Sequence, residues 1–550
     1  MKKIITFLLL YGFNIWAAPI SEDTASLVAA NFDAAYNNSD IRFETTLVYT
    51  FVTTKRTNVF YIFNIEKKRF VIVAADDRQE PILAYDNNSV FNVEQISPEL
   101  SYYFNNYQEE IQFLIDNNLI ADTDTTEQWA LLNSDIIPTM STNKALSATA
   151  GPLLSTCWGQ STPDNNLCPV NTVSNCRAIT GCVATAMSQI MNYWHYPQSG
   201  NGSYSYTWPN FGTLAANFGA TMYGWSGSNA DRALIMSHTG ISVNMQYGCN
   251  SSGAWVLLND QNGFHPRAAQ NAYVSHFRYD SSIQGVLRSN YNYSSWRNLL
   301  KGEIDNGRPI QYAGWSNQGG HTWVCDGYQT NVFGVKFHMN WGWNCSNNGY
   351  FRIPGHSLGN QSYFPSNEQA LVNIKPAPCP SNVVITGNYS NTITQSNTWI
   401  VSSGTTVIPT SSLVRLDAEP VNGFIQFNDG FSTQAGSVLI ARALDGCGSA
   451  LPTRINSNSD FVNVDVKEKE TKLIDRDLSI SPNPSNGLFK IESLNSLQSI
   501  EVYDITGKTI WKKTDLNKNT NSFDVDLSTI QNGIYLIKIN DTVIKKIVKQ

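Results

Sequence analysis

An amphipathic segment that begins with one cysteine constrains this chain more than any other stretch. Its sequence is Ile179-Thr-Gly-Cys-Val-Ala-Thr-Ala-Met-Ser-Gln-Ile-Met-Asn-Tyr-Trp194, and its apolar residues recur at the spacing of one buried helical face. Thr180 and Gly181 predict where the helix begins, which places Cys182 in or just before its first turn. Unpaired N–H groups and the positive end of the helix dipole favour a thiolate there, so Cys182 is a candidate nucleophile. A small core residue or one half of a disulfide is the other interpretation of such a cysteine.

The N-terminus predicts export from the cell. Residues 1–18 have the charged start and the short apolar core of a signal peptide, with Ala17 and Ala18 as the cleavage point. The apolar run is too short to cross a bilayer, and no later run reaches about 18 residues, so we expect no transmembrane segment. The net charge is -7, so the chain lacks the excess of positive charge that nucleic-acid-binding proteins carry, and nucleic acid is not an expected partner.

The nine cysteines suit an oxidising compartment. Because nine is an odd number, we expect eight disulfide-bonded cysteines and one free catalytic thiol. The sequence favours Cys168–Cys176, which would close a short loop, and Cys379–Cys447, which would join the ends of one module. The remaining candidates allow three pairings that the sequence does not separate: Cys157, Cys249, Cys325 and Cys345.

Composition divides the rest of the chain into four segments. Residues 19–147 contain predicted strands at 69–75 and 81–85 and a predicted helix that Ser97 caps with Pro98 at its first position, but no cysteine or histidine. This segment ends in a stretch rich in Ser, Thr and Ala, which we interpret as a linker cleaved near residues 135–150. Residues 148–375 contain all seven histidines, so the chemistry is expected there. Residues 379–465 and 476–550 have the short strands and polar turns of all-β modules, without a repeat of fixed period.

A cysteine nucleophile needs a general base, a group that orients the base, and donors for the oxyanion. His321 is the best candidate for the base, because the two glycines before it would let a substrate backbone approach. Residues 335–343 are interpreted as the return strand of a hairpin, and a turn near 330–331 would set Asn340 opposite or diagonal to His321. Gln160 is the candidate oxyanion donor, together with the backbone N–H of Cys182, and Trp341 would cover the histidine.

Other interpretations of these residues were weighed. Trp341 could serve only core packing, and His338, which shares a face with Asn340, is the histidine most easily misassigned. A zinc site made of His321, Cys325 and other thiols is disfavoured, because no C-x-x-C pair or H-E-x-x-H helix supports it. We therefore expect neither a metal nor another cofactor.

The candidate site resembles a known family. The motifs Trp158-Gly-Gln160, Thr180-Gly-Cys-Val-Ala-Thr185, Gly319-Gly-His321 and Asn340-Trp-Gly-Trp343 are similar, in order and spacing, to those of the streptopain family of secreted bacterial cysteine peptidases. The resemblance implies a papain-like fold with Cys182 as nucleophile and His321 as base. It also implies that Gln160 supplies the oxyanion hole and that Asn340 and Trp341 support the histidine. Residues 19–147 resemble the family's inhibitory propeptide.

The resemblance also implies a substrate-binding set, which is Gly320, Ser252, Gly253 and Ala254. The chain departs from the family here, because Cys249 and Asn250 precede this loop and Ala254 stands where a polar residue is expected. What the family implies about substrates is broad cleavage of proteins or peptides, with a preference for an apolar residue two positions before the scissile bond.

The last segment resembles the C-terminal sorting domain of the type IX secretion pathway. The similar stretches are 478–488, 500–507 and 532–537, followed by Lys545, Lys546 and Lys549. This resemblance implies the type IX machinery as a partner, export across both membranes, and then release or attachment to the cell surface. It gives no role to the module at 379–465.

The sequence thus predicts an α+β protein: a papain-like peptidase domain (148–375) behind a small α+β propeptide (19–147) and before all-β modules at 379–465 and 476–550. Its predicted function is that of a secreted cysteine endopeptidase made as a zymogen, with its own propeptide as inhibitor. Two alternatives stay open. One is a catalytically inactive surface binding protein or adhesin that uses the β modules, and the other is a transglutaminase-like acyltransferase.

Overall fold

The structure is a computed structural model. It describes residues 19–53, 57–138, 148–316, 319–358, 361–363, 365, 367–390, 392–418, 423–443, 478–493, 496–504, 508–514, 516, 520–540 and 543–550. The expected signal peptide, residues 1–18, lies outside the described residues. The chain forms two compact units, Met1–Arg454 and Ile455–Gln550. No described helix has the length and apolar character needed to cross a membrane.

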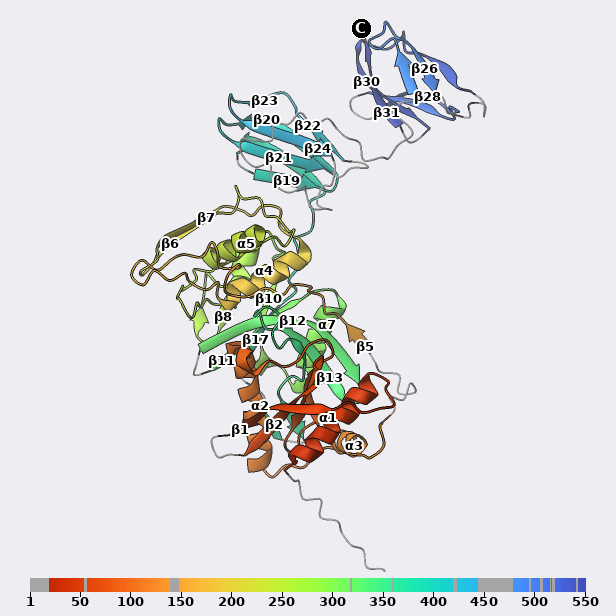
Figure 1. Cartoon of the computed structure of the whole chain (residues 1–550). Coiled ribbons are helices and arrows are strands. Elements are labelled where there is room, and N and C mark those ends of the chain that lie inside the picture. Colours follow the sequence, from red (N-terminus) through yellow and green to blue (C-terminus); the bar gives the residue numbers. More distant parts are fainter. Residues whose placement is uncertain are drawn as a thin grey trace, which may run out of the picture. The chain divides into compact units, whose positions relative to one another are not determined.

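One antiparallel sheet contains strands from both sides of the expected linker (Figure 1). Its order is β1 (Thr45–Val52), β2 (Asn58–Ile65), β3 (Arg69–Ala74), β4 (Ile82–Asp86), β14 (Gly349–Phe351), β13 (Gly334–Asn340), β12 (Gly319–Asn331), β11 (Ile310–Ser316), β17 (Glu368–Val372) and β10 (Gln284–Leu287), with β5 (Ala148–Ala150) paired to β12. The two parts join where Tyr85 pairs with Tyr350 and Ala84 with Phe351. The N-terminal segment therefore extends the sheet of the peptidase segment edge to edge.

The helices of the N-terminal segment cover this sheet. They are α1 (Glu22–Tyr36), α2 (Pro98–Asp116) and α3 (Thr123–Leu132), and the turn η1 (Val93–Gln95) precedes α2. Ser97 caps α2 as the sequence predicts, accepting a hydrogen bond from the Leu100 N–H at 3.1 Å, and Pro98 opens the helix. Tyr103 of α2 packs in one hydrophobic core with Trp323 and Trp341 of the peptidase segment. The two segments thus share a core as well as a sheet.

The cysteine-bearing helix lies in a second core. It is α4 (Cys182–Trp194), and it packs against α5 (Asn229–Ser242) on one side and β11 and β12 on another. Its apolar face is buried, as the spacing predicts, at Val183, Ala186, Met187, Ile190 and Met191, whereas Trp194 at its end is only partly buried. The remaining elements of the peptidase segment are β6 (Ser203–Trp208), β7 (Gly212–Asn217), β8 (Asn259–Asp260), β9 (Gly263–Phe264), α6 (Ala269–Ser275), η2 (Arg288–Asn290), α7 (Tyr293–Asp305), β15 (His356–Leu358) and β16 (Gln361–Tyr363).

The module that follows is a small parallel β-structure. Its strands form two sheets, one with β18 (Asn382–Asn388), β20 (Trp399–Ile408), β22 (Phe424–Gln426) and β23 (Phe431–Thr433), the other with β19 (Thr392–Ser396), β21 (Leu413–Ala418) and β24 (Val438–Ala443). The chain passes from one sheet to the other after each strand except β22, since β22 and β23 both pair with β20. The register pairs Asn382 with Trp399 and Trp399 with Phe424. Successive coils therefore differ in length, which explains why the sequence has no repeat of fixed period.

The second unit is an all-β sandwich. One sheet contains β25 (Leu478–Ser481), β26 (Leu488–Ser493) and β29 (Ser522–Asp526), and the other contains β28 (Thr509–Lys513), β27 (Ile500–Tyr503), β30 (Gly533–Ile539) and β31 (Val543–Lys549). Phe489, Ile491, Val502 and Ile537 lie in its core. The predicted α+β class with C-terminal all-β modules is thus confirmed.

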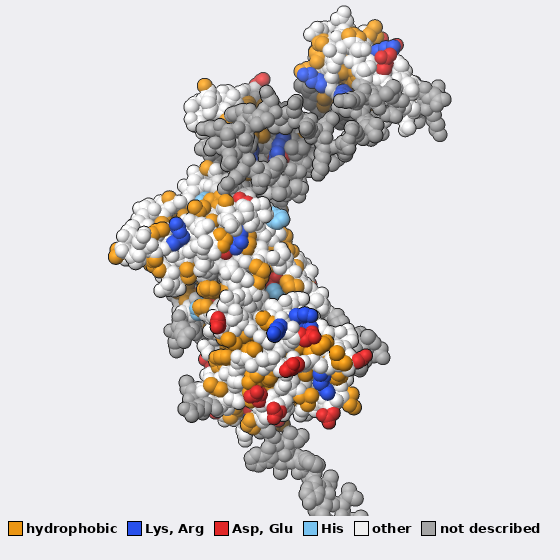
Figure 2. Space-filling model, in the orientation of Figure 1, with side chains coloured by type: hydrophobic (Ala, Val, Ile, Leu, Met, Phe, Trp, Pro, Cys, Tyr) orange, Lys and Arg blue, Asp and Glu red, His pale blue; other side chains and the backbone are white. Residues whose placement is uncertain are grey.

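On the face drawn in Figure 2, Lys and Arg side chains of the described residues form small separate groups among mostly uncharged ones.

Candidate active site

Cys182 is the first residue of α4, as predicted. Gly181 precedes it with a φ of 85°, in the region that favours glycine. A Cβ on Gly181 would also lie 2.8 Å from the Met245 side chain and 2.9 Å from the Ser252 carbonyl oxygen. Glycine is therefore needed at this position for two independent reasons. The sulfur of Cys182 is a free thiol, which excludes its interpretation as half of a disulfide.

In this form of the protein, the surroundings of Cys182 favour the neutral thiol over the thiolate. Burial raises the pKa of Cys182 to about 12, and the negative charge of Glu99 adds to the shift. The N–H groups of Thr322, Val183 and Cys182 itself lower the pKa, but by less. Desolvation and a nearby carboxylate thus outweigh the helix N-terminus, which by itself favours the thiolate.

His321 lies on β12, next to the Thr322 N–H that faces the thiol. Burial lowers the pKa of His321, which keeps the imidazole neutral near pH 7. The ring of Tyr102 from α2 lies 6.5 Å from the imidazole, centroid to centroid. Among the described residues, no hydrogen bond joins the His321 ring to Cys182 or to Asn340. The two groups thus lie on neighbouring elements without forming an ion pair.

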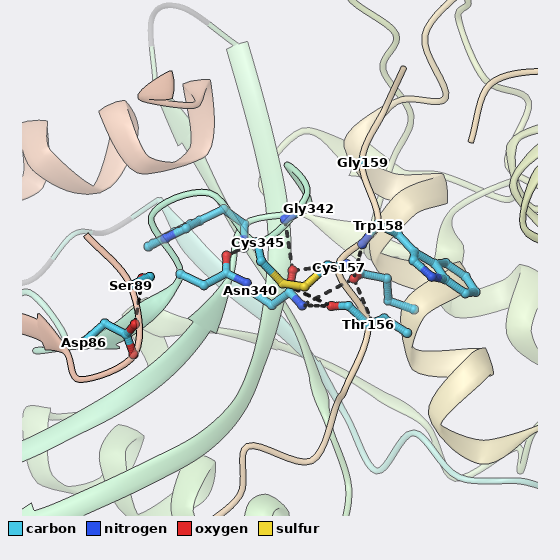
Figure 3. The surroundings of a disulfide bond; sticks show 12 residues. Asp86, Ser89, Thr156, Cys157, Trp158, Gly159, Asn340, Gly342 and Cys345 are labelled. Carbon is cyan, nitrogen blue, oxygen red and sulfur yellow. Dashed lines mark hydrogen bonds between the residues drawn. A yellow bond between two sulfur atoms is a disulfide. The ribbon is translucent and has the colours of Figure 1, made fainter. Parts of the chain in front are cut away.

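The predicted register between His321 and Asn340 is wrong. Asn340 pairs with Val324, because β12 runs to Asn331 before the turn and a bulge follows Cys325. The Asn340 amide instead donates to the Thr156 carbonyl oxygen at 2.9 Å and to Gln189 Oε1 at 3.3 Å, as Figure 3 shows in part. Asn340 therefore connects the loop before Gln160 to α4.

Trp341 has the packing role that the sequence left open. It is 1% exposed, and its indole N–H donates to the Asn347 carbonyl oxygen at 2.9 Å. Its ring lies among those of Tyr103, Trp323 and Phe351. His338 is likewise engaged elsewhere, since its Nδ1 lies 2.6 Å from the carboxylate of Asp326.

Gln160 lies beside the cysteine. Its carbonyl oxygen accepts a hydrogen bond from the Thr180 N–H at 3.0 Å, which fixes its loop against the start of α4. The loop is also joined to the segment after β13 by the Cys157–Cys345 disulfide (Figure 3). The Asn344 N–H, which donates to the Trp158 carbonyl oxygen at 3.2 Å, joins the same two segments. The position of Gln160 is thus set by covalent and backbone contacts.

Glu99 is a site residue that the sequence analysis missed. It belongs to the first turn of α2 and is 1% exposed. Its carboxylate accepts from the Gln160 side-chain amide at 3.4 Å and from the Trp343 indole N–H at 2.7 Å. Burial raises the pKa of Glu99 to about 7. An acidic residue in the first turn of a helix is ordinary, so only the fold reveals that this one reaches the active site.

The candidate substrate-binding residues come from two places in the peptidase segment, the loop after α5 and the start of β12. The Ser252 hydroxyl donates to the Ile179 carbonyl oxygen at 2.9 Å, and Gly253 pairs with Gln246. Ala254 packs against the same core as α4. Gly320 faces the ring of Trp315, which lies 2.6 Å from where a Cβ would be. Ser252 thus lies against the segment that precedes Cys182, and Gly320 directly precedes His321 on β12.

One disulfide differs from the expected pairing, and the other is a pair that the sequence left open. Cys176 pairs with Cys249 instead of Cys168, and Cys157 pairs with Cys345. Cys168, Cys182 and Cys325 are free, so the prediction of a single free thiol is wrong. Cys379 is disulfide-bonded, but its expected partner Cys447 lies outside the described residues.

Comparison with known families agrees with the motifs. Residues 158–351 match the Peptidase C10 family, residues 17–111 match the Spi protease inhibitor family, and residues 479–550 match the Secretion system C-terminal sorting domain. The resemblances inferred from the sequence are thereby confirmed.

Among curated proteins, the thiol protease/hemagglutinin PrtT of Porphyromonas gingivalis is 30% identical over 412 residues, which is 68% of this chain and 44% of PrtT. Streptopain of Streptococcus pyogenes is 28% identical over 349 residues, which is 58% of this chain and 80% of streptopain. The chain therefore spans less than half the length of PrtT but most of streptopain. A prointerpain A fragment of Prevotella intermedia superposes with a TM-score of 0.48 and 26% identity, over 61% of this chain and all of that fragment.

Proposed function

We propose that this chain, whose residues 158–351 belong to the Peptidase C10 family of cysteine peptidases, is a secreted endopeptidase made as an inactive precursor. One observation carries the proposal: the Gln160 loop is hydrogen-bonded to the segment that presents Cys182, whose sulfur faces the strand bearing His321. A nucleophile, a base and an oxyanion donor are thus available within one small region.

The proposed reaction is acyl transfer to water. The Cys182 thiol gives its proton to His321, and the sulfur bonds to the carbonyl carbon while the carbonyl oxygen takes up the electron pair. The Gln160 amide and the Cys182 backbone N–H hold that oxygen. His321 then protonates the leaving amine, and water, deprotonated by His321, hydrolyses the thioester.

The precursor is held inactive by its own propeptide. Two features support this. The propeptide and the peptidase segment share one sheet, and Glu99 of the propeptide accepts the hydrogen bond of the Gln160 amide and raises the pKa of the Cys182 thiol. Activation on this proposal requires α2 to leave the site, so that His321 and Cys182 can form their ion pair. Cleavage is expected before β5, since Ala148, Thr149 and Ala150 pair with β12 and are protected there.

The substrates we propose are proteins or peptides, taken by the loop around Ser252, Gly253 and Ala254 and by Gly320. Export is proposed to follow the type IX route, which the match of residues 479–550 to a secretion sorting domain supports. The apolar preference two positions before the scissile bond is carried over from the family resemblance.

The alternatives make different predictions. A catalytically inactive adhesin would show no preferential labelling of Cys182 by a thiol-directed peptidase inhibitor after reduction and removal of the propeptide. A transglutaminase-like enzyme would incorporate an added amine faster than it hydrolyses the peptide bond.

The central experiment compares wild type with Cys182→Ala in peptide-library cleavage and in N-terminal sequencing of the processed protein. Cys182→Ala should cleave no peptide and should remain unprocessed near residues 135–150. Cys325→Ala, which removes a buried free thiol elsewhere, is the matched control and should retain cleavage. Full activity of Cys182→Ala would refute the proposed mechanism.

A further inference from the structure

Two side-chain N–H donors from distant parts of the peptidase segment converge on one carboxylate beside the catalytic cysteine. Gln160 Nε2 lies 3.4 Å from Glu99 Oε1, and Trp343 Nε1 lies 2.7 Å from Glu99 Oε2. Both oxygens belong to the same carboxyl group, so the two donors point into the same small volume. Glu99 and Gln160 are 1% and 3% exposed, so water is largely excluded from this place.

The two segments that carry these donors are also joined to each other within the peptidase segment. Cys157 shortly precedes Gln160 and Cys345 shortly follows Trp343, and these two cysteines form a disulfide. The hydrogen bond from the Asn344 N–H to the Trp158 carbonyl oxygen joins the same two segments at 3.2 Å. Figure 3 shows this covalent connection next to Gly159 and Gly342. The peptidase segment therefore keeps both donors together when α2 leaves.

We propose that the indole N–H of Trp343 is a second side-chain donor of the oxyanion hole, alongside Gln160, and that the Glu99 carboxylate occupies the place of the oxyanion in the precursor. The proposal rests on the function proposed above, in which Gln160 serves the oxyanion. The proposal gives a catalytic role to Trp343, the second tryptophan of the Asn340-Trp-Gly-Trp343 motif. The two tryptophans then have different roles, because Trp341 packs in the core whereas Trp343 presents its N–H to the site.

The chemistry suits an indole. When the Cys182 sulfur bonds to the carbonyl carbon, the π electrons of the C=O bond move to oxygen, and the thiol proton goes to His321. The Trp343 N–H donates a hydrogen bond to that oxygen and keeps its proton, since an indole is a donor only and does not titrate. Charge on the oxygen develops in the transition state, so the donor lowers the barrier more than it strengthens substrate binding.

The test is Trp343→Phe in the full chain, which keeps an aromatic ring and removes the N–H. A variant that does not process itself is converted with a trace of wild-type enzyme, which is then removed. Losing one oxyanion donor should lower kcat about 10- to 100-fold, with KM changed less than about threefold. Trp225→Phe is the matched control, because it also removes an indole N–H hydrogen bond, to the Pro197 carbonyl oxygen at 3.2 Å. It should leave kcat unchanged.

Two reagents separate an oxyanion role from a structural one. A peptide aldehyde forms a tetrahedral adduct with its oxygen in the hole, so its affinity should fall by the same factor as kcat. Iodoacetamide alkylates the Cys182 sulfur without any oxyanion, so its rate should stay that of the wild type. If wild type cleaves peptides, two outcomes for Trp343→Phe would overturn the proposal. One is an equal loss of aldehyde affinity and of iodoacetamide labelling rate, and the other is an unchanged kcat. Absence of cleavage by wild type, or cleavage by Cys182→Ala, would instead remove the proposed function itself.

Discussion

Arg352 of the peptidase segment and Glu110 of α2 form an ion pair in which both side chains are buried, at 1% and 0% exposure. The guanidinium also donates to Gln79 Oε1 at 2.7 Å. A second ion pair between the two segments joins Lys336 Nζ to the Glu80 carboxylate at 3.0 Å. In both pairs the acid comes from the N-terminal segment and the base from the peptidase segment. Propeptide docking therefore buries charges that compensate each other only while the two parts stay together.

Removing Glu110 should destabilise the precursor. Glu110→Ala leaves the Arg352 charge buried and unpaired, which typically costs about 3–5 kcal/mol. The measurement is urea unfolding of the precursor in the Cys182→Ala background, where no processing occurs. Asp116→Ala, at an exposed position of the same helix, is the control and should change stability by less than about 0.5 kcal/mol. Equal effects of the two substitutions would contradict the importance of the ion pair.

Docking of α2 should weaken as pH rises from about 5 to 7. Burial raises the pKa of Glu99 from 4.5 to about 7. A carboxyl whose pKa is higher when docked binds its proton more tightly in the docked state, so protonation favours docking. Between the released and docked pKa values, each pH unit changes the docking equilibrium up to about tenfold per group.

Hydrogen exchange of α2 amides in the Cys182→Ala precursor measures this effect. The side chain at position 99 cannot titrate in Glu99→Gln. Dividing the exchange rate of the Cys182→Ala precursor by that of the same precursor with Glu99→Gln therefore removes the pH dependence that amide exchange has in any peptide. The ratio should rise with pH in this window. A flat ratio would show that Glu99 does not control the docking of α2.

The two described disulfides should affect catalysis differently. Replacing Cys157 and Cys345 by Ser removes the connection between the Gln160 loop and the Trp343 segment, so kcat should fall about tenfold or more while KM changes little. Replacing Cys176 and Cys249 by Ser should lower the melting temperature but leave kcat within about threefold. The comparison uses processed enzyme, with kcat and melting temperature measured for each pair. Equal losses of kcat would contradict a specific role for the first disulfide.

Local patterns predicted the helix at Cys182, because apolar spacing and a glycine before it depend only on neighbouring residues. The motifs around Gln160 and His321 were recognisable for the same reason. The register of Asn340 was not, since it depends on a bulge after Cys325 and on where the hairpin turns. A one-residue error in either reverses the face of every side chain that follows.

Contacts between distant segments were the least predictable. Nothing in the sequence near Tyr85 or Tyr350 indicates that β4 and β14 pair, because strand patterns are local and do not name a partner strand. Glu99 was overlooked for a related reason: an acidic residue in a first helical turn is common, and its partners Gln160 and Trp343 are far along the chain. The pairing of Cys176 with Cys249 likewise depends on the loop that carries Ser252 approaching the start of α4.

Gly314 should act as a sensor of propeptide docking. Gly314 of β11 pairs with His321 of β12. A Cβ added to Gly314 would lie 2.3–2.5 Å from three atoms of the Tyr102 side chain. Gly314→Ala should therefore push α2 away in the precursor, raising the rate at which iodoacetamide labels Cys182 about tenfold or more. Tyr102→Ala also opens the site, and adding Gly314→Ala to it should have no further effect, because the clash has already been removed. Additive effects of the two substitutions would mean that Gly314→Ala acts on the peptidase segment itself, and the steric explanation would then fail.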